Sequence, residues 1–143
     1  MHNLEKNREK NPLFVFIFVS LLTFAVDQLS KAVAEPLFLS VLNSNLALKT
    51  DLGINPLLVT LLIWVLLCYL VWRAQYLNWI SGLIIGGGAS NLVDRIILGG
   101  VRDWFPMPFL GGANNVADWA ISLGCIAYII VQLKTHQDEK KRR

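Results

Sequence analysis

Residues 79–98 read WISGLIIGGGASNLVDRIIL, a long apolar segment that becomes polar toward its end. A helix rises ~1.5 Å per residue, so a stretch of this length covers a hydrocarbon core of about 30 Å. Its apolar and small residues give way near the end to Asn91, Asp94 and Arg95. An ionisable residue inside a membrane span costs roughly 2.5–3.5 kcal/mol, so it needs a structural or functional reason. The stretch therefore predicts a membrane helix with one polar end.

A run of small residues, Gly86-Gly87-Gly88-Ala89-Ser90, lies in the middle of this predicted helix. The run lacks the lysine of a phosphate-binding loop. Small residues let helices approach closely in lipid. We therefore expect the run to bring the polar end of this helix against the last apolar segment of the chain.

The composition of the whole chain is also that of a membrane protein. Hydrophobic residues make up 55% of the 143 and charged residues only 16%, whereas a soluble domain carries roughly 25% charged residues. More than half of the charged residues lie in segments 1–10 and 134–143. This pattern excludes a soluble globular domain, a disordered chain and a disulfide scaffold. The two cysteines sit in apolar runs and the two histidines in the tails, so we expect no metal and no cofactor.

Three further apolar segments predict three more membrane helices. Pro12 and Pro56 stand where a first helical turn tolerates proline. We expect an all-α integral membrane protein with four transmembrane helices, forming a single domain over residues 1–143. The expected spans are 13–34, 56–72, 79–98 and 116–133, with outer linkers at 35–55 and 99–115.

Lysine and arginine residues set the expected orientation. With both termini and the 73–78 turn in the cytoplasm, the outer linkers hold only Lys49 and Arg102. We therefore predict cytoplasmic termini, with the basic C-terminal tail as a topology anchor that also touches anionic lipid. The nine basic residues placed inside are Lys6, Arg8, Lys10, Arg73, Lys134, Lys140, Lys141, Arg142 and Arg143.

The first 34 residues also partly match a cleavable signal peptide. A basic tail precedes an apolar run, and Ala32-Val33-Ala34 imitates a small-residue cleavage site. Asp27 and Lys31 fall between the apolar run and that site, however, and three more spans follow. We expect this segment to remain as the first span.

The acidic residues of the predicted spans share one depth. Asp27 lies about 21 Å from the inner end of the first span, and Asp94 lies about 22 Å from that of the third. Asp118 is near the outer end of the fourth span, and Asp103 stands in the outer linker just before it. The sequence thus predicts a polar site that faces the external water layer and is walled by three helices.

Spacing separates two kinds of carboxylate in this site. Asp27 and Lys31 share a helix face, and Asp94 has Arg95 beside it, so ion pairs that only hold the helices together remain an alternative for these residues. The other two carboxylates, Asp103 and Asp118, have no obvious basic partner in the sequence. Asp103 lies in a linker, where contact with water alone would account for an aspartate. Contact with water alone would not account for both Asp103 and Asp118.

Four motifs, in order and at matching depth, resemble those of the lipoprotein signal peptidases (signal peptidase II). The resemblance covers the chain from the first span to the fourth. It implies a four-span aspartyl protease of the bacterial inner membrane, with a small extracytoplasmic β-element in parts of 35–55 and 99–113. The family motifs are Asp-Gln-x-x-Lys, here 27–31; a glycine-rich stretch ending Asn-x-x-Asp-Arg, here 86–95; Val-x-Asp and an aromatic residue, here 101–104; and Asn-x-Ala-Asp, here 115–118.

The resemblance also implies a reaction and a set of site residues. Asp103 and Asp118 would form a catalytic dyad that cleaves a prolipoprotein before its diacylglyceryl-modified cysteine, at the outer face of the membrane. The expected partners are these substrates and membrane lipids, without nucleic acid, and the expected state is a monomer. The residues that would position the substrate or shape the edge of the site are Asp27, Lys31, Asn43, Asn91, Arg95 and Asn115.

Several residues depart from the family pattern and bear on substrate fit more than on chemistry. The motif Asn-x-Gly-Ala-Ala-Phe is only echoed at 43–48, where Asn45 and Leu46 differ, and Ser90 and Asn114 replace a glycine and an aromatic residue. The linker between the two aspartates also looks shorter than usual.

Two other functions stay open. One is a diverged relative that binds signal-peptide or lipoprotein helices without cleaving them, and the departures from the motifs favour it. The other is a small proton or cation transporter subunit. A conduction path would also need polar groups in the inner leaflet, and the predicted spans have none there.

Overall fold

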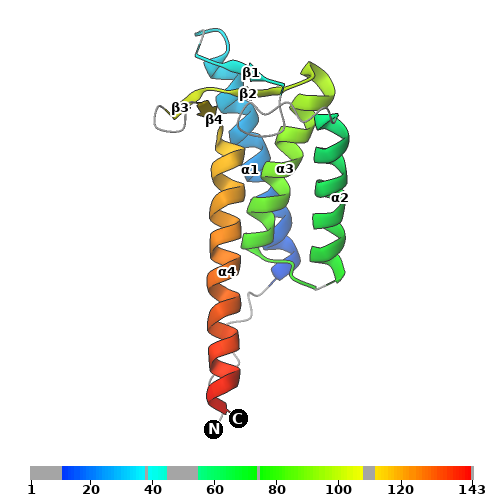
Figure 1. Ribbon diagram of the computed structural model, residues 1–143, viewed down its shortest axis with the longest axis vertical. Coiled ribbons are helices and arrows are strands. Elements are labelled where there is room, and N and C mark those ends of the chain that lie inside the picture. Colours follow the sequence, from blue (N-terminus) through cyan, green and yellow to red (C-terminus); the bar gives the residue numbers. More distant parts are fainter. Residues whose placement is uncertain (1–10, 38, 45–54, 74, 108–111, 143) are drawn as a thin grey trace.

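The computed structural model describes residues 11–37, 39–44, 55–73, 75–107 and 112–142. Over these residues the chain forms a helical bundle with short strands across one end (Figure 1). The predicted helical segments are confirmed as helices. The helices are α1 (Pro12–Ala34), α2 (Pro56–Arg73), α3 (Trp79–Leu98) and α4 (Val116–Arg142), and the strands are β1 (Val41–Asn43), β2 (Val101–Asp103), β3 (Phe105–Met107) and β4 (Gly112–Asn114).

Local signals fix both ends of α3, the helix that carries the polar motif. At its start, the Asn78 side chain accepts hydrogen bonds from the backbone N–H groups of Ile80 and Ser81, and the Ser81 hydroxyl accepts one from the Asn78 N–H. At its end, Gly99 adopts φ +74° and its N–H donates to the Arg95 carbonyl. The polar residues of α3 therefore lie in its last two turns, directly before β2.

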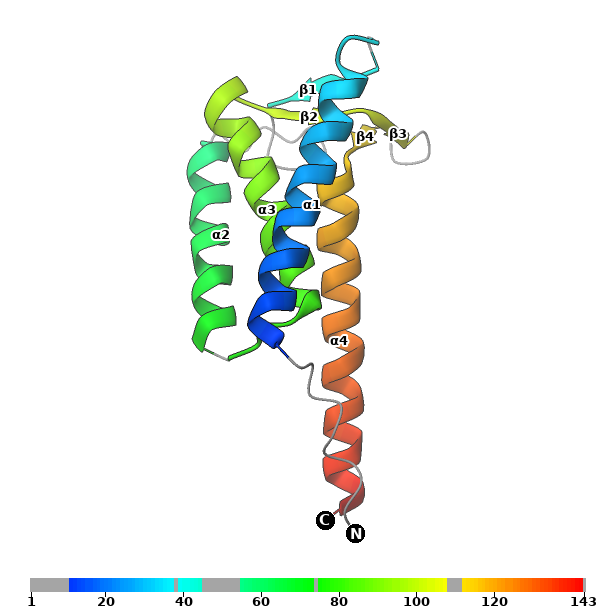
Figure 2. The same cartoon turned by 180° about the vertical axis from the view of Figure 1, so that it is seen from behind.

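Helix α3 lies at the centre of the bundle, against α1, α2 and α4 (Figures 1 and 2). The small-residue run explains this close approach. A Cβ atom on Gly86 would collide with the backbone carbonyl of Ser20 in α1, and one on Gly87 would lie 2.8 Å from the Ala117 carbonyl oxygen in α4. The expectation that this run packs α3 against the last helix is thus confirmed.

Three helices, α1, α2 and α4, are long and apolar enough to cross a membrane. No residue of α2 is buried, and most of its large apolar side chains are exposed, although Trp64 donates a hydrogen bond to the Ile85 carbonyl of α3. Helix α3 is not among the three, although its bounds match the predicted span. Because its neighbours cover much of its surface, α3 can carry glycines and polar residues that a helix facing lipid on all sides could not.

The last helix is longer than the predicted span. It continues from Leu133 to Arg142, through the charged segment that the sequence analysis treated as a tail. Lysine, glutamine and glutamate are good helix formers, and extending an existing helix needs no new nucleus. The end of α4 and the start of α1 lie at the same end of the bundle, opposite the strands (Figure 2).

The small β-element implied by the resemblance is present as two antiparallel pairs. Strand β1 pairs with β2, with Val41 opposite Asp103, and β3 pairs with β4, with Phe105 opposite Asn114. This register puts Asn43 and Asp103 on the same face of the first pair, in diagonal positions. Residues 45–48, which complete the echoed motif, and Lys6, Arg8, Lys10 and Lys49 lie outside the described residues.

Candidate active site

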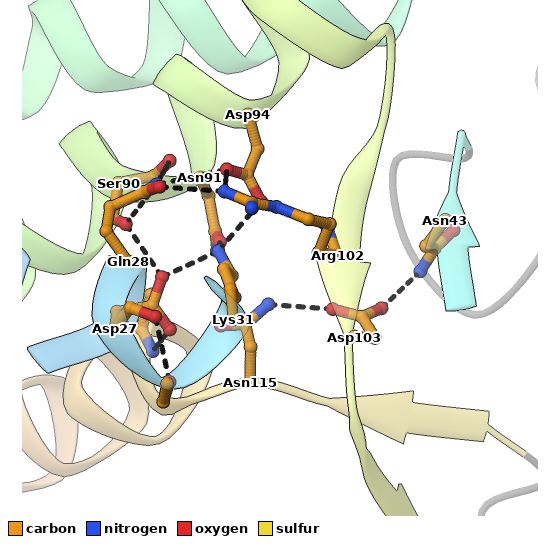
Figure 3. Close-up of polar contacts among 12 residues, drawn as sticks. Asp27, Gln28, Lys31, Asn43, Ser90, Asn91, Asp94, Arg102, Asp103 and Asn115 are labelled. Atoms are coloured by element: carbon orange, nitrogen blue, oxygen red, sulfur yellow. Dashed lines mark hydrogen bonds and ion pairs between the residues drawn. The ribbon is translucent and has the colours of Figure 1, made fainter. Parts of the chain in front are cut away.

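The strand-bearing end of the bundle gathers the polar residues that the sequence singled out (Figure 3). They come from α1, the end of α3, strands β1 and β2, and the start of α4. In the sequence these residues belong to four separate motifs. In the structure, hydrogen bonds join them into one network. The predicted site residues in or beside this network are Asp27, Lys31, Asn43, Asn91, Arg95, Asp103, Asn115 and Asp118.

Asp103 is held from two sides by amide groups. Asn43 Nδ2 donates to its Oδ2 at 3.0 Å, and Asn115 Nδ2 donates to its Oδ1 at 2.7 Å. The side chain lies on β2 and the residue is only 4% exposed. Burial raises the pKa of the Asp103 carboxyl above its ordinary value, while the two amide donors and the charges of Lys31 and Arg95 act in the opposite direction.

Asp118 lies in the first turn of α4, where a helix N-terminus favours a carboxylate. Asn91 Nδ2 donates to its Oδ1 at 2.8 Å, and its own backbone N–H donates to Asn115 Oδ1 at 2.9 Å. The Asn115 amide therefore contacts both aspartates, since its Nδ2 bonds Asp103. The charge of Asp103 also acts on Asp118. The two predicted catalytic carboxylates thus share one network, joined through a single side chain.

Lys31 occupies the centre of a buried charge cluster. Its Nζ lies 2.6 Å from Asp27 Oδ2 and 3.1 Å from Asp94 Oδ2, and it donates to Asn91 Oδ1 at 3.0 Å. An ammonium group has three N–H donors, and three acceptors surround this one. Because Asn91 in turn donates to Asp118, Lys31 is connected to the candidate dyad through one amide.

Asp27 is fully buried and ties three helices together. Its Oδ2 accepts a hydrogen bond from the Ser90 hydroxyl of α3 at 2.7 Å, and its Oδ1 accepts one from the Ala117 N–H of α4 at 2.8 Å. Its expected ion pair with Lys31 is confirmed. These contacts favour the alternative that the Asp27–Lys31 ion pair holds the helices together.

Asp94 has partners that the sequence analysis did not single out. It pairs with Lys31 and with Arg102, whose Nη2 lies 2.8 Å from Asp94 Oδ1 and whose backbone N–H donates to Asp94 Oδ2. The sequence placed only Arg95 beside it. Successive residues on a helix point in directions about 100° apart, whereas the turn at Gly99 brings Arg102 back over the end of α3. The short connection between α3 and β2 was the sequence feature from which the Asp94–Arg102 ion pair could have been predicted.

Ser90 and Gln28 are two further residues whose roles the sequence did not reveal. The Ser90 hydroxyl donates to Asp27 and accepts a hydrogen bond from Gln28 Nε2 at 2.9 Å, and Gln28 Nε2 also lies 3.0 Å from Asp94 Oδ1. The serine that departs from the family glycine therefore has a hydrogen-bonding role in this chain.

Three aromatic rings near the two carboxylates in the sequence contact one another in a row. Trp104 follows Asp103, Trp119 follows Asp118, and Phe105 lies between the two rings with edge-to-face geometry and centroid distances of 6.0 and 6.3 Å. Phe105 and Trp119 are exposed, so the row presents apolar surface at this end of the bundle. Within the part of the chain that the structure describes, no group of three histidine, cysteine or acidic side chains is placed to hold a metal ion.

Comparison with known proteins identifies the family. Residues 19–134 match the family model of signal peptidase (SPase) II. A lipoprotein signal peptidase of Campylobacter jejuni is 34% identical over 142 residues, which covers 83% of this chain and 88% of that protein. Another, from Caldicellulosiruptor bescii, is 27% identical over 143 residues, with 87% and 95% covered.

The fold has a counterpart among solved structures. A bacterial membrane enzyme determined by the in meso method at 2.3 Å superposes with a TM-score of 0.71, covering 88% of this chain and 92% of that one. Its sequence identity is 19%, so this likeness concerns the fold alone. The match to the family model over most of the chain and the identity to the Campylobacter protein show that this chain belongs to the signal peptidase II family.

Proposed function

We propose that this protein is a lipoprotein signal peptidase, which removes the signal peptide from a prolipoprotein immediately before the diacylglyceryl-modified cysteine. The observation that carries the proposal is a pair of carboxylates, the buried Asp103 and the half-buried Asp118, connected through the amide of Asn115. Membership in a peptidase family and the names of the relatives support the reaction and the class of substrate.

The two aspartates would act as an aspartic protease dyad. Two carboxylates in one buried network do not both ionise easily, so they share a proton. The ionised one takes a proton from a water molecule, whose oxygen attacks the scissile carbonyl carbon. The protonated one donates a hydrogen bond to the carbonyl oxygen, and a proton then passes to the leaving amine. Since the dyad titrates as a unit, its two roles belong to the pair.

The neighbouring polar residues would hold the dyad and the substrate backbone. Asn43, Asn91 and Asn115 already orient the carboxylate oxygens, and the charge of Arg95 acts on both aspartates. A substrate with two acyl chains and a polar scissile peptide needs an apolar surface beside a polar one, and the Trp104–Phe105–Trp119 row supplies such a surface.

The protein would lie in the bacterial inner membrane with its termini in the cytoplasm and the dyad toward the periplasm. The apolar surfaces of α1, α2 and α4 are typical of a multi-pass membrane protein. The central α3 would be the fourth span, and the excess of Lys and Arg away from the strand-bearing end supports the orientation. One chain supplies both aspartates, which supports a monomeric enzyme.

Cleavage of a diacylglyceryl-modified prolipoprotein by purified protein in lipid tests the proposal. We expect the wild type to cut before the modified cysteine, and Asp103→Asn and Asp118→Asn each to lower the rate at least about 1,000-fold, as loss of a catalytic-unit member does in other proteases. Asp138→Asn, a matched change at an exposed position of α4, should leave the rate unchanged. A folded wild type that cuts no lipobox sequence would instead support the non-cleaving relative.

A further inference from the structure

Arg102 stands immediately before the candidate catalytic Asp103 on strand β2 and faces the other way. Side chains alternate along a strand, so Asp103 points to Asn43 and Asn115 while Arg102 points to the helices (Figure 3). Its guanidinium contacts Asp94 of α3 and, through Nη2 at 2.8 Å, Gln28 Oε1 of α1. One side chain therefore attaches β2 to two helices at the residue next to Asp103.

We propose that Arg102 is a positioning residue, which clamps β2 onto α1 and α3 and so holds Asp103 where the dyad needs it. The proposal rests on the proposed peptidase function of the site. Arg102 fills the variable position of the Val-x-Asp motif, so the motif itself assigns it no role. Its contribution comes from this chain's own contacts.

The inner contacts of Arg102 are the strong part of the clamp. Asp94 is 1% exposed, and its carboxylate accepts hydrogen bonds from the Arg102 backbone N–H at 3.1 Å and from Nη2 at 2.8 Å. The same carboxylate thus holds both the main chain and the side chain of one residue. The outer contact, Nη1 to Glu35 Oε2 at 3.2 Å, involves a carboxylate that is 57% exposed. Exposed ion pairs contribute little, so we assign the clamp to Asp94 and Gln28.

Strand β2 needs such an attachment because its own structure holds it weakly. It has three residues and pairs with a strand of three residues, and an isolated two-stranded pair is only marginally stable in water. Gly99 and Gly100 precede it, and glycine leaves the backbone free to change direction. Without the arginine side chain, β2 keeps the bond from its backbone N–H to Asp94 but loses the guanidinium contacts with α3 and α1, so it is held less firmly. A misplacement of about 1 Å in a catalytic group lowers a rate by about 100-fold.

Kinetics of Arg102 variants in lipid test the clamp. We expect Arg102→Gln to lower kcat about 100-fold with little change in KM, because the groups that would bind the substrate backbone remain. Arg102→Lys keeps the charge opposite Asp94 but cannot also reach Gln28 in a fork, so we expect it to recover about 10-fold of that loss. Glu35→Gln is the matched control, since it removes only the exposed contact, and its kcat should stay within about two-fold of the wild type.

The pH profile separates positioning from a merely structural role. Asp103 is surrounded by the charges of Lys31 and Arg95 and by the carboxylate of Asp118, and it accepts two amide hydrogen bonds. Burial raises the pKa of Asp103 and the amide donors lower it. If β2 shifts so that the carboxyl stays buried but loses these donors, the pKa of Asp103 rises further and the acid limb of kcat/KM moves to higher pH. A purely structural role for Arg102 would lower the amount of folded enzyme and leave the acid limb of the folded fraction unchanged.

The outcomes distinguish this proposal from the proposed function. A wild type that cuts, with folded Arg102→Gln showing an unchanged kcat and acid limb, would overturn the clamp alone. A folded wild type that cuts nothing would overturn the peptidase function and the clamp with it. If Arg102→Gln does not fold, Arg102→Lys tests the proposal in its place. A kcat and an acid limb equal to those of the wild type in Arg102→Lys would refute positioning. A lower kcat with a shifted acid limb would support it.

Discussion

Replacing Lys31 by methionine removes the central charge of the buried cluster while keeping the length of the side chain. Lys31 is 0% exposed and lies between Asp27 and Asp94, at 2.6 and 3.1 Å. In the variant, Asp94 keeps Arg102 as an ionic partner. Asp27 keeps only the neutral donors Ser90 and the Ala117 N–H. The uncompensated charge is therefore left mainly on Asp27.

The size of the effect follows from that geometry. Removing one partner of a buried ion pair lowers the free energy of unfolding by about 3–5 kcal/mol, because a charge is left inside without compensation. We expect Lys31→Met to fall in this range. Neutralising the stranded carboxylate should recover part of the loss, so the double variant Asp27→Asn/Lys31→Met should be more stable than the sum of the single effects by about 1–3 kcal/mol.

Unfolding in detergent, followed by tryptophan fluorescence as denaturant is added, measures these free energies. Lys134→Met is the matched control, because it makes the same substitution at an exposed position of α4, and we expect a change of less than about 0.5 kcal/mol. A Lys31→Met protein within about 1 kcal/mol of the wild type would refute the reasoning. So would strictly additive effects of the Asp27 and Lys31 substitutions, since the two residues would then not be energetically coupled.

Three further predictions concern the dyad and the helix packing. Asn115→Ala removes the amide that contacts both aspartates, so kcat should fall about 100-fold; an unchanged kcat would contradict its bridging role. Burial raises the pKa of the Asp103 carboxyl above its ordinary value. Because the dyad titrates as a unit and needs one ionised carboxylate, kcat/KM should fall on the acid side at a pH above the ordinary pKa of an aspartate; an acid limb at or below that ordinary pKa would contradict the buried dyad. Gly87→Ala places a methyl group 2.8 Å from the Ala117 carbonyl oxygen, which should lower stability by about 1–3 kcal/mol; Gly112→Ala, with open space around its Cβ, should not.

The helices could be predicted because their signals are local. Apolar segments of sufficient length, with Pro12 and Pro56 at their starts, gave bounds within a residue or two for α1, α2 and α3. The last helix continues nine residues beyond the predicted span 116–133, because a charge run ends a membrane span without ending a helix. The apolar pattern predicts which residues contact lipid. Beyond the lipid, helix propensity determines whether the helix continues.

The candidate site was predicted as a set of residues but not as a set of contacts. The shared depth of Asp27, Asp94 and Asp118 placed them at one end of the bundle. The pair of Asp94 with Arg102 depends on the direction in which β2 leaves α3, and the bond from Ser90 to Asp27 depends on how closely α3 approaches α1. Such facts arise from packing between segments far apart in the sequence, which a motif cannot record.

Because α4 is one uninterrupted helix, positions along it can be used to measure depth in the membrane. Its 27 residues make a helix about 40 Å long, roughly 10 Å more than the hydrocarbon layer of a bilayer. Lys134 and Lys141 stand on the same rigid axis, about 10 Å apart along it. Fluorescent or spin labels at these two positions would therefore sample lipid head groups and water in turn, and would report how deeply the candidate active site at the opposite end of the same helix is immersed.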